Sequence, residues 1–119
     1  MNRLQDFAEA WLRDWNSHDL EVILRHYAED VVFRSPKVAG FTDSDVDTLK
    51  GRDALRPYFA RGLANRPGLK FDLIVATTDH DGVAIVYTAE DGRTAVETMS
   101  INREGEVAEA RVFYNPPIA

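Results

Sequence analysis

Residues 70–115 read "KFDLIVATTDHDGVAIVYTAEDGRTAVETMSINREGEVAEARVFYN", a stretch rich in β-branched and aromatic residues that short turn sequences interrupt. The turns DHDG, EDG and REG separate segments of ordinary strand length. Because such short connections join antiparallel neighbours, the pattern predicts a meander of hairpins. Its expected strands are residues 70–78, 83–90, 93–102 and 106–115.

Within this meander, the segment "TAVETMSI" at residues 94–101 places a carboxylate among apolar residues. Strand side chains alternate between two faces. One face carries Ala95, Glu97, Met99 and Ile101, and the other carries Thr94, Val96, Thr98 and Ser100. A register shift that moved Glu97 to the second face would move Met99 and Ile101 with it. Either the first face is exposed, or the carboxylate is buried for a functional reason.

The first half of the chain has the three- and four-residue apolar spacing of helices. Residues 3–15 predict a helix with an aromatic inner stripe, and residues 19–30 repeat the pattern. A third helix is expected at residues 51–64, where Pro57 predicts a bend or a late start because an interior proline removes a hydrogen bond.

The segment between the second and third predicted helices has a different pattern. Residues 31–35, "VVFRS", predict a strand that ends at Pro36. Residues 36–50 show no steady period and are expected to form a long irregular loop of the kind that often binds ligands. The order of elements predicts a single α+β domain over residues 1–119, with helices first and a curled antiparallel sheet after them.

Composition restricts the classes of function. The 119 residues carry a formal net charge of -6, and their lysines and arginines are scattered, so nucleic acid is not an expected partner. The absence of cysteine excludes disulfides, thiol catalysis and cysteine-ligated zinc. The first residues contain acids where a signal peptide would be apolar, and no stretch reaches the length of a membrane span. A cytoplasmic protein without membrane association is therefore expected.

Three segments carry a resemblance to a known family: "WNSHDLEVILRHYAEDVVFRSP", "GRDALRPYF" and "SINREGEVAEARVFYN". In this order and spacing the chain resembles the nuclear transport factor 2-like superfamily, in its branch of ketosteroid isomerases and SnoaL-like polyketide cyclases. The resemblance implies a cystatin-like α+β barrel, in which a cone-shaped curved antiparallel sheet wraps over three N-terminal helices and encloses an apolar pocket. It also implies a homodimer that packs through the sheet face with Thr94, Val96, Thr98 and Ser100.

The resemblance also suggests roles for single residues. Glu97 matches the position of an aspartic acid that, in the isomerases, hydrogen-bonds the developing oxyanion. The isomerases' oxyanion tyrosine matches Trp11, and their general-base aspartate matches Ser35. A serine without a base accepts protons poorly, so the usual steroid isomerisation is not expected. The alternative for Glu97 is a salt bridge with Arg111 on the neighbouring strand.

These observations predict a pocket for an apolar, oxygen-bearing small molecule such as a polyketide, steroid-like or terpenoid compound. The catalytic candidate is Glu97, acting by acid/base chemistry with no metal and no organic cofactor. The residues expected to bind the ligand are Trp11, Trp15, Tyr27, Phe33, Ser35, Tyr58, Phe59, Tyr87, Met99, Val112 and Tyr114. Two alternatives stay open: a non-catalytic ligand carrier, and an interaction module that uses the sheet face.

Overall fold

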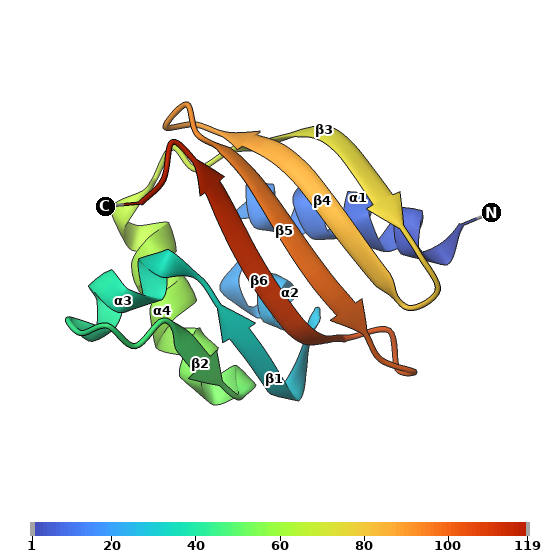
Figure 1. Ribbon diagram of the computed structural model, residues 1–119, viewed down its shortest axis with the longest axis horizontal. Helices are drawn as coiled ribbons and strands as arrows, with labels where there is room; N and C mark the ends of the chain where they lie inside the picture. Colours follow the sequence, from blue (N-terminus) through green and yellow to red (C-terminus); the bar gives the residue numbers. More distant parts are fainter. Residues whose placement is uncertain (1, 119) are drawn as a thin grey trace.

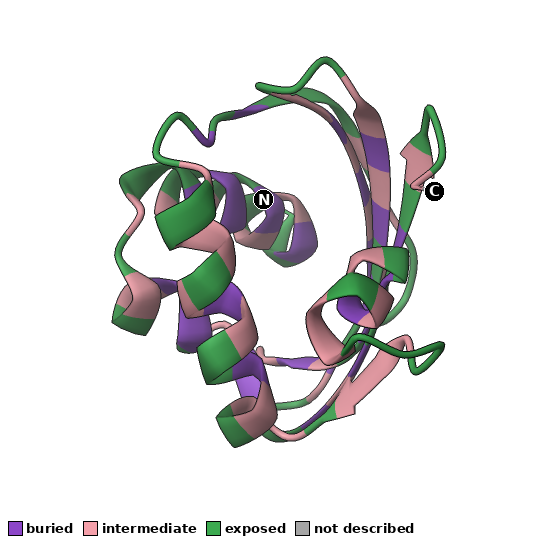
Figure 2. Cartoon of the chain, turned by 90° about the vertical axis from the view of Figure 1, so that its left-hand side faces the viewer, coloured by how far each residue is buried: buried purple, intermediate pink, exposed green. Residues whose placement is uncertain are grey.

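The computed structural model describes residues 2–118, which form a curved sheet wrapped over helices (Figures 1 and 2). The helices are α1 (Arg3–Ser17), α2 (Leu20–Leu24), α3 (Pro36–Thr42) and α4 (Arg52–Asn65). The strands are β1 (Tyr27–Arg34), β2 (Thr48–Lys50), β3 (Phe71–Thr78), β4 (Gly82–Ala89), β5 (Thr94–Ile101) and β6 (Val107–Asn115). The predicted α+β fold is thus confirmed.

The strands lie in the order β2-β1-β6-β5-β4-β3. Strands β3 to β6 form the predicted antiparallel meander, and their ends agree with the sequence prediction within one residue. Two of the turns use glycines with positive φ, Gly92 at 85° and Gly105 at 80°, a conformation that glycine adopts without steric cost. Strand β1 joins the sheet by pairing parallel to β6 and antiparallel to β2.

Helix α1 forms as the sequence predicts and packs across the inner face of β3 and β4 (Figure 1). The Asn2 side chain caps its first turn by accepting hydrogen bonds from the backbone N–H groups of Leu4 and Gln5. At its other end, Asn16 exchanges two hydrogen bonds with the backbone of Phe71, which fixes the helix to the start of β3.

The core lies between the helices and the concave side of the sheet, where buried residues of the two layers face each other (Figure 2). Its largest fully buried side chains include Trp11, Tyr27, Leu55 and Ile85. None of the helices within residues 2–118 is long and apolar enough to cross a membrane.

The prediction of a helix over residues 19–30 is wrong beyond Leu24. Strand β1 begins at Tyr27, because Tyr27, Val31 and Phe33 bury one side of an extended segment that pairs with β6. The register shifts between Tyr27 and Val32, so the acidic residues between them are exposed where the ladder is irregular. A helical period and a bulged strand produce the same apolar spacing over so short a stretch.

The prediction of an irregular loop over residues 36–50 is also wrong, since the segment contains α3 and β2. Ser35 caps α3 and Pro36 occupies its first turn, where the missing N–H of proline costs nothing. Helix α4 begins at Arg52, directly after Gly51, so Pro57 does not delay its start but lies inside the helix.

Candidate functional site

Glu97 lies on the concave face of the sheet, where its side chain is only 4% exposed. On β5 it is paired with Ile85 of β4 and Val112 of β6, and both of those residues are buried as well. The first face of the segment 94–101 is therefore buried, as one of the two sequence interpretations required. Arg111 is opposite Thr98 on the other face, and within residues 2–118 it forms no salt bridge with Glu97.

A cavity of about 190 Å³ lies beside Glu97 and is walled by α1, α3, α4 and the sheet. Aromatic rings make up much of its surface. Of the residues that the sequence suggested, those lining the cavity are Trp15, Phe33, Tyr58, Phe59, Tyr87, Glu97, Val112 and Tyr114. Their role in ligand binding stays a prediction.

The Glu97 carboxyl has one hydrogen-bond partner among the described residues. The Tyr87 hydroxyl donates to Oε1 over 3.1 Å, and Oε2 has no partner within residues 2–118. Burial raises the pKa of Glu97 to about 8, and the hydrogen bond from Tyr87 opposes that shift only in part. Near neutral pH the carboxyl is mostly protonated, so it can donate a hydrogen bond; once ionised, it can accept a proton.

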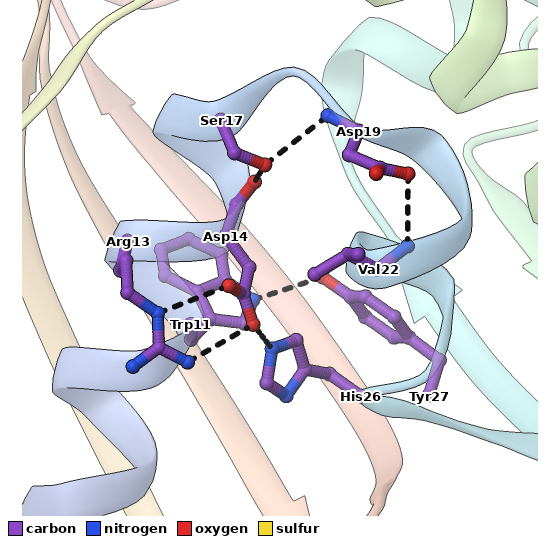
Figure 3. Close-up of polar contacts among 8 residues, drawn as sticks. All are labelled: Trp11, Arg13, Asp14, Ser17, Asp19, Val22, His26 and Tyr27. Atoms are coloured by element: carbon purple, nitrogen blue, oxygen red, sulfur yellow. Dashed lines mark hydrogen bonds and ion pairs between the residues drawn. The ribbon is translucent and has the colours of Figure 1, made fainter.

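Trp11 and Tyr27 do not line the cavity, although the sequence suggested both. The Trp11 indole Nε1–H donates to the Tyr27 hydroxyl over 3.0 Å (Figure 3), and both side chains are completely buried. Burial raises the pKa of Tyr27, and so does the nearby Glu97 carboxyl, so the phenol stays neutral. The pair supports the wall, and it leaves the Trp11 N–H no free hydrogen for a ligand.

Ser35 and Met99 are buried outside the cavity lining. The Ser35 hydroxyl accepts a hydrogen bond from the backbone N–H of Lys37 as the cap of α3, and it lies beside the phenols of Tyr58 and Tyr114. Burial raises the pKa of Tyr58 to about 12, and the nearby Ser35 hydroxyl opposes that shift only in part. Ser35 therefore caps α3 and lies near two tyrosines that do reach the cavity.

The sequence interpretation missed two cationic residues of the lining, Lys37 and Arg66. Lys37 was assigned to an irregular loop, whereas it lies in the first turn of α3 with its Nζ 4.8 Å from the centroid of the Tyr114 ring. The available signal was the pair Ser35-Pro36, since a serine cap followed by proline is typical of a helix start. Arg66 follows the last turn of α4, where no sequence pattern marks a pocket.

A polar contact joins α1 to His26, the residue before β1. The His26 ring Nε2 lies 2.7 Å from Oδ2 of Asp14, and Arg13 contacts the same carboxylate (Figure 3). None of these three residues lines the cavity. Their chemistry is therefore structural within the described site.

A family model for the SnoaL-like domain matches residues 8–113 of the chain. A SnoaL-like protein of unknown function from Burkholderia thailandensis is 32% identical, with a TM-score of 0.86 and 92% of each chain covered. No curated protein of established function matches the chain.

More distant structures share the fold. The epoxide hydrolase/cyclase-like enzyme SalBIII, from pyran ring formation in the polyether salinomycin, is 18% identical with a TM-score of 0.73; 92% of this chain and 88% of that one are covered. TerC, co-crystallised with polyporic acid, is 16% identical with a TM-score of 0.77, covering 95% and 92%. At these identities the likeness shows the fold alone.

Proposed function

The chain belongs to the SnoaL-like domain family, and from this premise we propose that it binds a small oxygen-bearing molecule in the cavity beside Glu97 and moves a proton on it. The single observation that carries the proposal is the Glu97 carboxyl, buried on the cavity wall with one oxygen unpartnered among the described residues. Burying a carboxyl without full hydrogen bonding costs free energy. Its presence on a cavity wall despite this cost is typical of a functional group.

The chemistry follows from the protonation state of Glu97. A neutral carboxyl beside the cavity donates a hydrogen bond to a carbonyl oxygen, which stabilises the negative charge that grows there during enolisation. With its pKa near 8, the same group also gives up its proton at modest cost and then serves as a base. The Tyr87 hydroxyl bonded to Oε1 holds the carboxyl in one orientation. This supports isomerase- or cyclase-type reactions on a small oxygen-bearing compound of the polyketide or terpenoid type, since a cavity of about 190 Å³ is close to the size of one ring and too small for the four rings of a steroid.

A second candidate is a ligand carrier that does no chemistry. The composition of the lining favours this candidate. Among the described residues that line the cavity, Glu97 is the only one with a carboxyl group, and none is a histidine. The position where the isomerases keep their general base holds Ser35, whose hydroxyl is used to cap α3. Without a second acid or base, Glu97 would have to remove the proton from the ligand and also return it.

One experiment separates the two candidates without knowledge of the natural substrate. Deuterium incorporation next to the carbonyl of cyclohexanone, followed by NMR in heavy water, reports proton transfer directly. The enzyme proposal expects exchange above the buffer rate that is lost in Glu97→Gln, a variant of the same shape. Glu109→Gln, on the exposed outer face of β6, is the matched control and should retain the exchange. Binding of the ketone with no enhanced exchange would leave only the carrier.

A further inference from the structure

The charged lining of the cavity contrasts with the rest of the protein. The chain carries a formal net charge of -6. The lining nevertheless contains two basic residues, Lys37 and Arg66, and only one acidic residue, Glu97. Glu97 is held neutral by burial up to a pH of about 8, which its raised pKa sets. At neutral pH the lining therefore holds two cationic side chains and no ionised acid, in a protein that is acidic as a whole.

Arg66 is already neutralised by a partner. Its guanidinium forms two hydrogen bonds with the Glu90 carboxylate, at 2.8 and 2.7 Å, and the two side chains are each about three-quarters buried. Such a two-point pair satisfies both charges and fixes the guanidinium beside the Phe71 ring. Arg66 thus shapes the cavity wall and has little charge left to attract a ligand.

Lys37 differs from Arg66 because it has no carboxylate partner within ion-pair distance among residues 2–118. Its ammonium lies over the Tyr114 ring, 4.8 Å from the centroid, in a half-buried position on the cavity wall. A cation over an aromatic face gains some electrostatic attraction, but the face accepts no ordinary hydrogen bond, and within residues 2–118 the Lys37 ammonium has no carboxylate partner. An anionic group in the cavity would supply that acceptor.

Neutral donors lie close to the same position. The phenols of Tyr58 and Tyr114 both line the cavity, and both lie beside the buried Ser35 hydroxyl. A phenol is protonated at neutral pH, and burial raises the pKa of both tyrosines further, so each carries a hydrogen that it can donate. An ammonium and two phenols in one region form a set of donors suited to a carboxylate or a similar oxyanion.

We propose that the cavity selects a single-ring compound that carries a carboxylate, with the carboxylate bound by Lys37 and the ring extending toward Glu97. The inference rests on the proposed function, because it concerns the same cavity. The size of the cavity agrees with one ring, since its volume is about 190 Å³ and an engineered protein cavity of roughly 150 Å³ holds benzene. The aromatic side chains of Trp15, Phe59 and Phe71 provide the surface for that ring.

The test compares benzoate with benzamide, which has the same ring and nearly the same shape but no charge. Affinities are measured by NMR titration of the full chain at pH 7, with the Trp15 indole N–H as the reporter of binding in the cavity. We expect the wild type to bind benzoate about tenfold more tightly than benzamide, the value of one charge-assisted contact. Lys37→Met should remove that preference and leave the benzamide affinity unchanged.

Two further variants make the result specific. Lys37→Arg, which keeps the charge, should retain the preference for benzoate. Lys50→Met removes an equal charge from the exposed surface of β2, outside the cavity, and should bind both compounds as the wild type does. A loss of preference in Lys50→Met as large as in Lys37→Met would mean that net charge, rather than Lys37, selects the anion, and would overturn the inference.

The remaining outcomes separate this inference from the proposed function. If benzamide binds in the cavity as tightly as benzoate, the anion selectivity is refuted while the cavity remains a small-molecule site. If neither compound shifts the Trp15 resonance at millimolar concentration, a one-ring carboxylate is refuted as the ligand class. The exchange experiment with cyclohexanone then still decides the proposed function, because that probe carries no charge.

Discussion

The Glu97 carboxyl gives the protein a stability that depends on pH in an unusual direction. The folded state keeps this proton up to a pKa of about 8, whereas the unfolded chain releases it near the ordinary glutamate value of 4.5. Between these values the unfolded state binds fewer protons, so the free energy of unfolding falls as pH rises. The loss amounts to about a tenfold decrease in the folding equilibrium constant per pH unit.

This predicts the behaviour of Glu97→Gln, which cannot ionise. Urea denaturation at several pH values from 5 to 8 should show that the variant lacks this part of the slope and gains stability relative to the wild type as pH rises. The difference between the two proteins isolates Glu97, because all other titrating groups are shared. Parallel pH dependences in both proteins would mean that Glu97 is solvated and would remove the basis for the proposed function.

The Tyr87 hydroxyl is predicted to set how acidic Glu97 is. Its hydrogen bond to Oε1 lowers the pKa of Glu97 against the larger effect of burial. Tyr87→Phe should therefore raise the pKa of Glu97 above 8, as measured by NMR titration of the labelled carboxyl. Tyr58→Phe is the control, since Tyr58 also lines the cavity but forms no hydrogen bond with Glu97, and it should leave the Glu97 pKa nearly unchanged. An equal effect of both variants would contradict the role of this hydrogen bond.

At the scale of elements, Ser35 connects helix α3 to the site. Its side chain caps α3 and lies beside two tyrosines of the lining, while Lys37 occupies the first turn of that helix. Loss of a serine cap typically costs about 1 kcal/mol, and here the hydroxyl is also completely buried.

We therefore predict that Ser35→Ala lowers the free energy of unfolding by about 1 to 2 kcal/mol and also weakens any binding that depends on Lys37. Chemical denaturation and the benzoate titration measure the two effects. Ser100→Ala, at an exposed position of β5, should change stability by less than about 0.5 kcal/mol. A stability loss in Ser35→Ala no larger than in this control would show that the cap does not hold α3.

The elements differ in how well the sequence predicts them, for physical reasons. The hairpins of β3 to β6 are local, so their alternating pattern and glycine turns are sufficient to define them, and the same alternation places Glu97 in the interior. Strand β1 depends on a distant partner, β6, which overrides the helical spacing of residues 25–30. Lys37 reaches the cavity only through the tertiary placement of α3, which contacts the edge strand β2, and no local pattern encodes that placement.

The whole molecule exposes an apolar row on the convex side of the sheet. The register pairs Val75 with Val86, Val86 with Val96, and Val96 with Phe113, so these side chains cross the sheet on one face. Val75 is 46% exposed and Phe113 44%, although residues of this kind are usually more buried. The neighbouring Thr98 and Ser100 are small and exposed, which suits close contact with a second sheet.

We propose that two copies of the chain pack through this row, and the final prediction concerns Val96, near its middle. In a two-fold symmetric contact the same surface of both copies meets, so a residue near the middle lies close to the same residue of the other copy. Val96→Asp would therefore bury two carboxylates near each other and should dissociate the dimer. Light scattering coupled to size-exclusion chromatography should then report a dimer for the wild type and a monomer for the variant.

The matched control is Val46→Asp in the segment between α3 and β2, where Val46 is 51% exposed and lies outside the row. Because the row and the cavity lie on opposite faces of the sheet, Val96→Asp should still bind benzamide in the cavity. A wild-type monomer at 100 μM would refute the dimer and leave the apolar row without this explanation.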